Sequence, residues 1–449
     1  MNMKLKFLYI TLFIGGIYAT KAQNDTLPQT HYLSLNDTRE YAVANNYQNQ
    51  NAEIDIEAAK KKIWETTAIG LPQINGNVNY NNSLQIPTTL LPGEIVGQPG
   101  EQIPVQFGQQ HSLNWGITAN QLIFSGEYIV GLQASKIFLE LSKRSYTKSS
   151  ITIKETVTKS YYLVLIAEES KRILEETSAN FENLLKEIEE SHRLGFVEDI
   201  DVDQLRLTKQ NNDNTIISVT NQVSLAYRLL KYQLGIDFKD EISLSDSLEY
   251  FIDNLDFNRL LAEDFDLNQN IDYKLMQTQE GLSILDMKRE KSLFLPQLSA
   301  FYTYSENAYN NEFSDLFSTW YPTSILGLKV AIPIFSSGMR ISRVQQKQLE
   351  LKKIQNSKLE LEQGLTLQVE QLRSDFTNAK LKYDNEKWNM ELSQRINDKT
   401  EIKYKQGMAS ANDLMITQNQ YLMSLNNYYQ AMSSLLSIRA ELEYILEKN

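Results

Sequence analysis

The stretch that decides the fold is Leu328-Lys329-Val330-Ala331-Ile332-Pro333-Ile334-Phe335-Ser336-Ser337-Gly338, followed by a run without proline up to Tyr404-Lys405-Gln406-Gly407. The alternating side chains at its start predict a strand, and the residues from Pro333 to Gly338 predict a turn. A helix from about Met339 to Gln406 would be roughly 100 Å long at about 1.5 Å per residue. Because helices of globular domains average about 11 residues, this run indicates an unusual architecture.

The same plan occurs earlier in the chain. Asn120-Gln121-Leu122-Ile123-Phe124-Ser125-Gly126 leads into a second long helical run, which ends at Arg193-Leu194-Gly195. No proline lies between Pro104 and Pro296, or after Pro333. Because proline breaks helix interiors, both regions are free to be helical. The chain is therefore predicted to be internally duplicated, with a strand feeding a long helix in each half.

Two segments carry the two-residue period of strands. In the first, apolar side chains alternate with Asn75, Asn77, Asn79 and Asn81, which is typical of a strand with one apolar and one polar face. We predict one β-hairpin at 73–124, with an irregular loop rich in proline and glycine, and a second at 297–335. Leu71-Pro72-Gln73 and Leu295-Pro296-Gln297 introduce them.

Four strands cannot close a membrane barrel, and open sheet edges are not tolerated in lipid. If these strands lie in a membrane, several chains must share one barrel. The asparagine face would then line water, and the apolar face, which holds Ile74, Val78, Tyr80, Trp115 and Ile117, would contact lipid.

Apolar residues recur every three or four positions in the long runs, which predicts coiled-coil seams. In the second half the seam is Leu365, Val369, Leu372, Phe376, Ala379 and Tyr383. We expect a first repeat at 23–234 with a tip near 195, an acidic connecting, equatorial segment at 235–267, and a second repeat at 268–449 with a tip near 407. Each repeat would hold a helix, a β-hairpin and a long helix pair.

The first 22 residues have the pattern of a secretory signal peptide, with a basic start, a short apolar core and a cleavage site at Thr20-Lys21-Ala22. The chain has no cysteine, which excludes disulfides, thiolate metal sites and a lipid on an N-terminal cysteine. A net charge of -12 argues against nucleic acid as a partner. Such an exported chain fits the envelope of a Gram-negative bacterium.

No motif indicates catalysis. The three histidines, His31, His111 and His192, lie in different segments without metal-ligand spacing. The sequence contains no phosphate-binding loop, nucleophile elbow or zinc-binding helix motif. We therefore predict a protein that is not an enzyme and that has no cofactor and no metal.

The ends of the two long helices share a pattern. Gly195 and Gly407 suit left-handed helix caps, and an aspartate lies six residues later in both cases, at Asp201 and Asp413. These aspartates could cap the helices that follow. In a symmetric ring of subunits they could instead form a circle of carboxylates, which selects cations and raises its own pKa values by mutual repulsion. Both interpretations stay open at this point.

The order and spacing of several features resemble the TolC family of outer-membrane factors over about residues 33–447. These features are the duplicated plan, the two Leu-Pro-Gln segments, Leu122-Ile123-Phe124-Ser125-Gly126, Pro333-Ile334-Phe335-Ser336-Ser337-Gly338 and the glycine tips. The resemblance implies an α+β membrane protein and a homotrimer. Each subunit would give four strands to one twelve-stranded barrel in outer-membrane lipid and its coiled-coil helices to a periplasmic tunnel. The tips would form the entrance and meet a periplasmic adaptor, and an inner-membrane pump of the RND or ABC type would supply substrate.

In the best-studied member of that family, a tyrosine, a basic residue and aspartates hold the entrance shut. Tyr404 and Asp413 match the tyrosine and the first aspartate, and Asp201 matches the aspartate of the outer coil. Ala409 stands where that member has arginine, and Ile416 where it has a second aspartate. These departures indicate a looser gate here, or one closed by other contacts.

The sequence therefore favours a passive conduit for efflux or type I secretion. A soluble periplasmic coiled-coil scaffold or adaptor is the alternative, and it leaves the alternating hairpins unexplained. An envelope enzyme with a helical stalk, using Asp201 and Asp413 as catalytic carboxylates, has no supporting motif.

Overall fold

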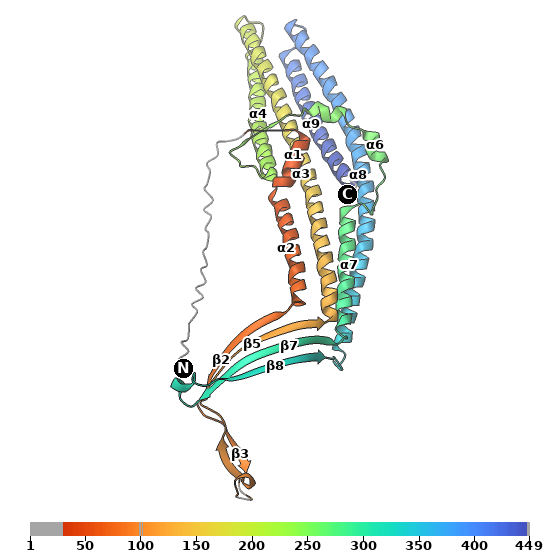
Figure 1. Ribbon diagram of the computed structural model, residues 1–449. Helices are drawn as coiled ribbons and strands as arrows, with labels where there is room; N and C mark the ends of the chain where they lie inside the picture. Colours follow the sequence, from red (N-terminus) through yellow and green to blue (C-terminus); the bar gives the residue numbers. More distant parts are fainter. Residues whose placement is uncertain (1–29, 98–99, 101, 447–449) are drawn as a thin grey trace.

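The molecule consists of a tall array of long helices with a curved sheet at one end (Figure 1). The computed structural model describes residues 30–97, 100 and 102–446. The predicted signal peptide lies outside these residues. The four longest helices are α3 (Gly126–Arg193), α4 (Asp199–Leu234), α8 (Met339–Lys405) and α9 (Ala411–Leu446). Among the described residues, no helix combines the length and apolar character that crossing a membrane requires.

The sheet is antiparallel and has the order β2-β5-β7-β8. Its strands are β2 (Gln73–Asn82), β5 (His111–Phe124), β7 (Gln297–Asn310) and β8 (Tyr321–Ala331). Each predicted hairpin supplies two strands, and the pairing of β5 with β7 joins the two halves of the chain. Within the described residues, β2 and β8 are the edges of this sheet.

The two faces of the sheet differ in polarity because opposite residues of paired strands share a face. On one face, Asn77 donates its amide to Asn114 Oδ1 at 3.2 Å, and Asn114 donates to Asn307 Oδ1 at 2.7 Å. The other face is mostly apolar, although Glu306 lies on it, and it holds Ile74, Val78, Trp115, Ile117, Tyr302, Leu326 and Leu328. Val78 is 72% exposed, so an apolar sheet surface lies open on the chain.

The loop between β2 and β5 is more regular than expected. Residues 88–92 and 102–106 form a second antiparallel pair, β3 (Thr88–Pro92) and β4 (Gln102–Gln106), connected in part by the 3₁₀ turn η1 (Gly93–Val96). The expectation of an irregular loop was wrong here. Proline is compatible with this pair because both strands of a two-stranded ribbon have a free edge, where no N–H is needed.

The predicted coiled-coil seam of α8 is confirmed residue by residue. Its buried apolar side chains are Leu365, Val369, Leu372, Phe376, Ala379 and Tyr383. All of them except Leu365 pack with buried residues of α9, among them Met432 and Leu435, in the main hydrophobic core. The helices α3 and α4 pair in the same way through Phe181, Leu184, Val202 and Leu205.

Short elements form a belt across the long helices at mid-height (Figure 1). They are α1 (Leu35–Asn45), the parallel pair of β1 (Thr30–Leu33) and β6 (Glu241–Leu244), α5 (Leu248–Asp253) and α6 (Phe257–Ala262). Two arginines of the long helices bind belt carbonyls: Arg439 donates to Phe251 O at 2.9 Å and Arg373 to Glu263 O at 2.5 Å. The belt is therefore attached by hydrogen bonds as well as by apolar packing.

The remaining helices are α2 (Tyr47–Ile69) and α7 (Ile271–Ser292), which flank α3 between the belt and the sheet. We expected a single helix before Leu71, but α1 and α2 are separate. Asn46 has an extended backbone, with ψ of 129°, and its side chain accepts a hydrogen bond from Gln48 N–H. The side chain of Asn46 thus caps α2, which favours a break at this residue over a continuous helix.

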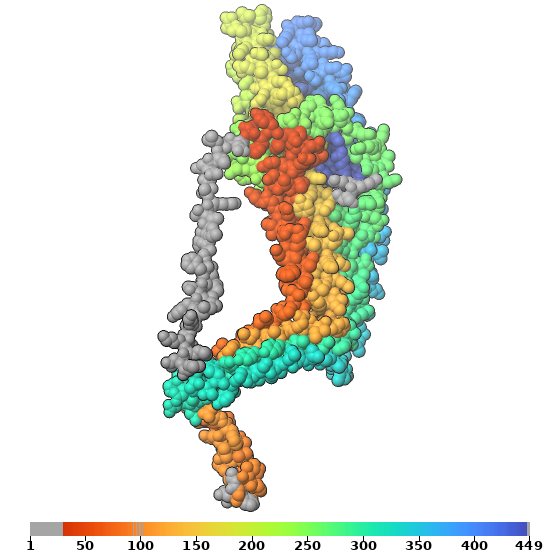
Figure 2. Space-filling model, in the orientation of Figure 1, coloured from red at the N-terminus to blue at the C-terminus, as the bar shows by residue number. Residues whose placement is uncertain are grey.

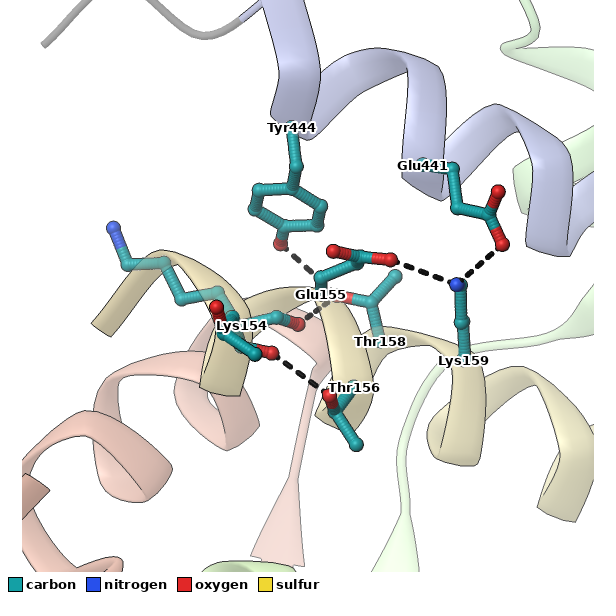
Figure 3. A network of polar contacts seen from close by, with 8 residues as sticks. Lys154, Glu155, Thr156, Thr158, Lys159, Glu441 and Tyr444 are labelled. Atoms are coloured by element: carbon teal, nitrogen blue, oxygen red, sulfur yellow. Dashed lines mark hydrogen bonds and ion pairs between the residues drawn. The ribbon is translucent and has the colours of Figure 1, made fainter. Parts of the chain in front are cut away.

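A polar network joins α3 to α9 at the level of the belt (Figure 3). Lys159 donates to Glu155 at 2.7 Å and to Glu441 at 2.6 Å, and the Thr158 hydroxyl lies 3.1 Å from Tyr444 OH. Burial lowers the pKa of Lys159, but the hydrogen bonds to both glutamates outweigh it and raise the pKa above its ordinary value. Lys159 therefore stays charged and holds the C-terminal helix against the other coil.

Phe376→Ala tests whether the α8 seam and the belt share one core. Phe376 is fully buried and its ring lies 5.0 Å from that of Phe257 in α6, measured between centroids. We expect the substitution to destabilise the folded chain by about 3–5 kcal/mol, because a buried aromatic side chain is replaced by a cavity. Chemical denaturation measures this change.

Phe376→Leu is the matched control, and a smaller loss is expected because most of the volume remains. Equal losses for both variants would contradict tight packing at this position.

Candidate functional site

The two helix-hairpin tips end in the same backbone structure. At the first tip, Gly195 N–H donates to His192 O at 2.9 Å and Phe196 N–H to Ser191 O at 2.9 Å. At the second, Gly407 N–H donates to Tyr404 O at 2.9 Å and Met408 N–H to Lys403 O at 2.8 Å. Both patterns are Schellman motifs, which satisfy the last carbonyls of a helix. The internal duplication therefore extends to the hydrogen bonds of the tips.

Glycine is required at both tips by backbone conformation alone. Gly195 has φ of +81° and Gly407 has φ of +72°, in the left-handed region that other L residues rarely adopt. A Cβ atom at either position would meet open space within 4 Å. These glycines therefore turn the chain without packing against a neighbour.

Asp413 is the capping partner of Ser410 at the start of α9. Ser410 N–H donates to Asp413 Oδ2 at 3.0 Å, Ser410 Oγ–H donates to the same oxygen at 2.7 Å, and Asp413 N–H donates back to Ser410 Oγ at 3.1 Å. These reciprocal bonds form a capping box. The hydrogen bonds from Ser410 lower the pKa of Asp413. Within one chain, the helix-cap interpretation therefore accounts for this carboxylate.

Asp201 and Tyr404 lie in a different environment from Asp413. Asp201 is in the first turn of α4, where a negative charge is favourable beside the helix N-terminus. Tyr404, on α8, packs against the buried cluster of the α3–α4 tip. Burial raises the pKa of Tyr404, and the charges of Asp201 and Glu187 raise it further. Tyr404 thus joins the second coil to the first by apolar packing, in the electrostatic field of two carboxylates of the first coil.

An apolar cluster holds the tips of the two coils together. It is made of Phe181, Leu184, Ile188, Val202 and Leu205 from the first coil and Ala411 and Leu414 from the second, with Tyr404 at its edge. An ion pair below the tip, from Arg206 to Glu189 at 2.7 Å, ties α4 to α3. The coils are therefore fixed to each other by apolar contacts, and α4 to α3 by charge as well.

Large apolar side chains are exposed at the tips themselves. Leu194 is 61% exposed, Phe196 is 81% exposed and Met408 is 65% exposed. Exposed apolar groups of this size, gathered at one end of a molecule, mark surfaces that meet another protein. Among the described residues, there is no group of three or more His, Asp or Glu side chains that could hold a metal ion.

The predicted water-facing residues Asn75, Asn77, Asn79 and Asn81 all lie exposed on the polar face of β2. Alternation also predicted Asn114 on the polar face of its strand, but sequence reasoning missed Asn307 and the side-chain bonds that join Asn77, Asn114 and Asn307, which only the strand register reveals. It also missed Ser410 and Glu187 at the tips. Ser410 carried a local signal, since Ser410-Ala411-Asn412-Asp413 has the spacing of a capping box. Glu187 carried none, because its proximity to Tyr404 depends on how the coils pack.

The geometry described so far has a counterpart in a known family. The sequence profile of the family described as outer membrane efflux protein matches residues 39–235 and 286–446, which is most of the chain and both repeats. The chain belongs to this family. It is an efflux channel of the outer membrane, and the resemblance to the TolC family is confirmed.

Solved structures agree with this assignment at the level of the fold. The efflux channel resembles the outer membrane protein VceC of Vibrio cholerae, with a TM-score of 0.70 at 11% identity over 92% of this chain and 95% of VceC. It also resembles the CmeC outer membrane channel of Campylobacter jejuni, with a TM-score of 0.70 at 17% identity over 92% and 86%. The open state of the MtrE outer membrane channel of Neisseria gonorrhoeae gives 0.69 at 16% over 92% and 88%. No curated protein matches the efflux channel.

The expected α+β fold with long helices is thereby confirmed. Members of the family act in tripartite systems, which include a partner adaptor. The alternative of a soluble scaffold is not supported by the family assignment.

Ser410→Ala tests the capping box of the efflux channel. We expect the first turn of α9 to lose about 1 kcal/mol of stability, because an N-cap oxygen is removed. Amide hydrogen exchange at Asn412 to Leu414 should then be about fivefold less protected, since 1.4 kcal/mol corresponds to a factor of about ten. Ser410→Thr keeps the oxygen and should change little, so equal protection in both variants would contradict the cap.

The cap has a defined pH dependence. Because the folded pKa of Asp413 is lowered, its contribution is fully present above the unfolded pKa of about 3.9 and is lost as the pH falls through the lower folded value. Protection factors in this turn should therefore be constant from about pH 7 to 5 and decrease below about pH 4.

Proposed function

We propose that three copies of the chain form a passive conduit that receives substrates from an inner-membrane pump of the RND or ABC type, through a periplasmic adaptor, and releases them outside the cell. The observation that carries this proposal is the four-stranded sheet, which has one polar face, one apolar face and two unpaired edges. In lipid, unpaired edges must be satisfied by another chain. Pairing β2 of one copy with β8 of the next satisfies every edge at once.

The dimensions of such a barrel suit a water-filled passage. Twelve strands about 4.8 Å apart and tilted by about 40° give a circumference of roughly 75 Å and a radius of about 12 Å. The polar faces of the three sheets would line this passage. Its wall would be rich in amides and hydroxyls, beginning with Asn75, Asn77, Asn79 and Asn81.

The wall is also nearly free of charge. On the polar face of the four described strands, Lys329 is the only Asp, Glu, Lys or Arg residue. A neutral polar wall offers weak contacts to many solutes and holds none of them tightly. This composition supports a conduit whose selectivity lies in the pump, and whose energy comes from the pump rather than from chemistry in this chain.

The tips are proposed to meet the adaptor. Apolar side chains of that adaptor would cover Leu194, Phe196 and Met408. The adaptor would be the one that works with the pump. The outer-membrane end would contact lipid through the apolar sheet face. Catalysis has no part in this proposal.

The first test is the assembly state of the protein extracted from outer membranes. We expect a trimer that needs detergent and that dissociates to the monomer on boiling, because the three sheets share one hydrogen-bonded barrel. Gel mobility with and without heating, and mass measurement in detergent, provide the readout. A monomer or dimer that stays in solution without detergent would overturn the conduit.

The periplasmic entrance is proposed to be closed by contacts around Tyr404 and the aspartates of the tips. Tyr404 binds the two coils together within one chain, beside Asp201 and Glu187. Asp413 already has hydrogen-bond partners in its own helix turn. A gate at this level would therefore depend more on the Tyr404 contact than on Asp413, unless the three copies of Asp413 surround a narrow opening.

Two substitutions of Asp413 separate capping from gating. Asp413→Gln removes the charge but keeps a side chain that completes a capping box, whereas Asp413→Ala removes both. If three Asp413 carboxylates surround the opening, both variants should lose cation preference, by roughly twofold or more in single-channel permeability ratio. If Asp413 only caps α9, Asp413→Gln should behave as wild type.

Tyr404→Ala provides the positive control for opening. It removes an apolar contact between the coils, so we expect a higher single-channel conductance than in Tyr404→Phe, which keeps the ring. Conductance and cation preference that stay unchanged in every Tyr404 and Asp413 variant would remove these residues from the gate.

A further inference from the structure

A long groove runs along α3, between α2 and α7, at the end of the helical array that is next to the sheet. In the space-filling view these three helices lie side by side between the belt and the sheet (Figure 2), and α3 packs against both of the others. The groove has a volume of about 1040 Å³. Small-molecule sites usually have volumes of roughly 300–1000 Å³, so this groove can hold a sizeable solute.

The groove exists because the α3 side chains along its floor are small. They are Gly131, Ala134, Ser135, Ser142 and Ser145. Larger apolar side chains line the groove as well and are open to solvent: Phe138 of α3 is 44% exposed, and Ile69 of α2 is 56% exposed. The groove therefore presents apolar surface that the described part of the chain does not cover.

The groove opens on the side of the polar sheet face. Leu122 and Gln297 line its end at the sheet. Leu122 pairs with Ser299, which pairs with Lys329, and Gln297 is two residues before Ser299 on the same strand. Because alternate residues of a strand point to the same side, both lie on the face of Lys329. In the proposed conduit this side is the water-filled passage, so passing solutes would meet the groove.

Three carboxylates line the groove without a partner. They are Asp55 on α2, Glu127 on α3 and Asp286 on α7. Among the described residues, none of the three takes part in a hydrogen bond or an ion pair. Their negative charges are therefore available to a solute.

The cations in and beside the groove, in contrast, each have a glutamate partner. These pairs are Lys62–Glu65 at 2.8 Å, Arg289–Glu290 at 3.8 Å and, on the neighbouring α8, Lys347–Glu350 at 2.7 Å. The uncompensated charge of the groove is thus negative. An apolar floor beside uncompensated carboxylates favours a solute that is both apolar and positively charged.

Asp286 lies close enough to the apolar floor for one solute to contact both. A Cβ atom at the first residue of α3 would meet Ser292 of α7, and one at Gly281 would meet Ile137 of α3. The two helices therefore run antiparallel, and this register places Asp286 about 9 Å from Phe138 along the groove, at about 1.5 Å per residue.

We propose that this groove binds amphiphilic organic cations as they pass through the conduit. The apolar body of the solute lies against Phe138, and its charge lies near Asp286. This inference rests on the proposed function, because only in the conduit does the groove face passing solutes. All of its lining residues belong to one chain, so each copy in a trimer offers an equivalent site.

Three probes of matched shape or charge test the class of ligand. Tetraphenylphosphonium is an apolar cation, tetramethylammonium carries the charge without the apolar body, and tetraphenylborate has the apolar body with a negative charge. Binding is measured by equilibrium dialysis against heat-modifiable trimers held in lipid nanodiscs, with empty nanodiscs as the blank. We expect saturable binding of tetraphenylphosphonium at one site per chain, and at least several-fold weaker binding of the other two probes.

Matched variants locate the site. Asp286→Asn removes the charge and Phe138→Ala removes the apolar surface, and each should weaken the binding of tetraphenylphosphonium several-fold. The controls are Glu53→Gln on α2 and Ile129→Ala on α3. Glu53 is exposed and Ile129 is 45% exposed, and neither lines the groove. Both controls should bind the probe as the unaltered channel does, and heat modifiability shows that each variant still forms its trimer.

A single thiol can report whether the groove is occupied, because the native chain has no cysteine. Ser142→Cys places the thiol on the floor of the groove, and Gln133→Cys places it at an exposed position of α3 outside the groove. Tetraphenylphosphonium should slow the alkylation of Ser142→Cys by iodoacetamide, a neutral reagent, several-fold. The alkylation of Gln133→Cys should not change.

Three results would overturn the inference while leaving the trimer established. The first is equal binding of tetraphenylphosphonium and tetraphenylborate. The second is equal affinity for tetraphenylphosphonium in Asp286→Asn, Phe138→Ala and both controls. The third is a Ser142→Cys thiol that iodoacetamide cannot reach without any probe, which would mean that lipid or another part of the assembly already fills the groove. Failure to form any trimer would instead overturn the proposed function.

Discussion

The structure depends on one constraint, which is that backbone N–H and C=O groups at a sheet edge must find partners where water is absent. In a closed barrel, four strands per chain require four strand pairings per chain. A single chain makes three of them, β2–β5, β5–β7 and β7–β8. The outer edges of β2 and β8 are left for other copies. The duplicated sequence follows from this constraint, since each half supplies one hairpin, and the pairing of β5 with β7 makes one curved surface from the two.

The helices transmit that arrangement over a long distance. Both α3 and α8 begin shortly after a strand and continue without interruption for 68 and 67 residues, so the position of each strand determines where a helix starts. Most of the stability of protein helices comes from packing of an apolar face, which the seams of Leu, Val, Phe and Tyr supply here. At mid-height, Arg373 and Arg439 attach the belt to the second coil through its carbonyls, and the Lys159 network joins α3 to α9.

Local patterns predicted the elements that depend on local physics. The seam from Leu365 to Tyr383 was visible because a helix repeats its contacts every three or four residues, and the turn glycines were visible because only glycine tolerates the left-handed conformation. The β3–β4 pair was missed because its prolines suggested irregular structure, although free edges tolerate them. The amide ladder from Asn77 to Asn307 depends on strand register, and the effect of Asp201 on the pKa of Tyr404 depends on how the coils pack. Neither can be predicted from a local sequence pattern, because the residues involved lie far apart in the sequence.

The two tips have the same backbone but different anchors, and this difference bears on which of them can move. The start of α9 is fixed by the reciprocal bonds of Ser410 and Asp413. At the start of α4, Glu198 makes no side-chain capping bond, and the first tip is held by His192, whose Nδ1 lies 3.0 Å from Val197 O, by the favourable charge of Asp199 and Asp201 and by packing against Tyr404. The start of α4 therefore lacks the side-chain cap that the start of α9 has. Separation of the coils would loosen the α3–α4 tip more than the α8–α9 tip, and an adaptor that covers Leu194 and Phe196 would act on the less constrained of the two.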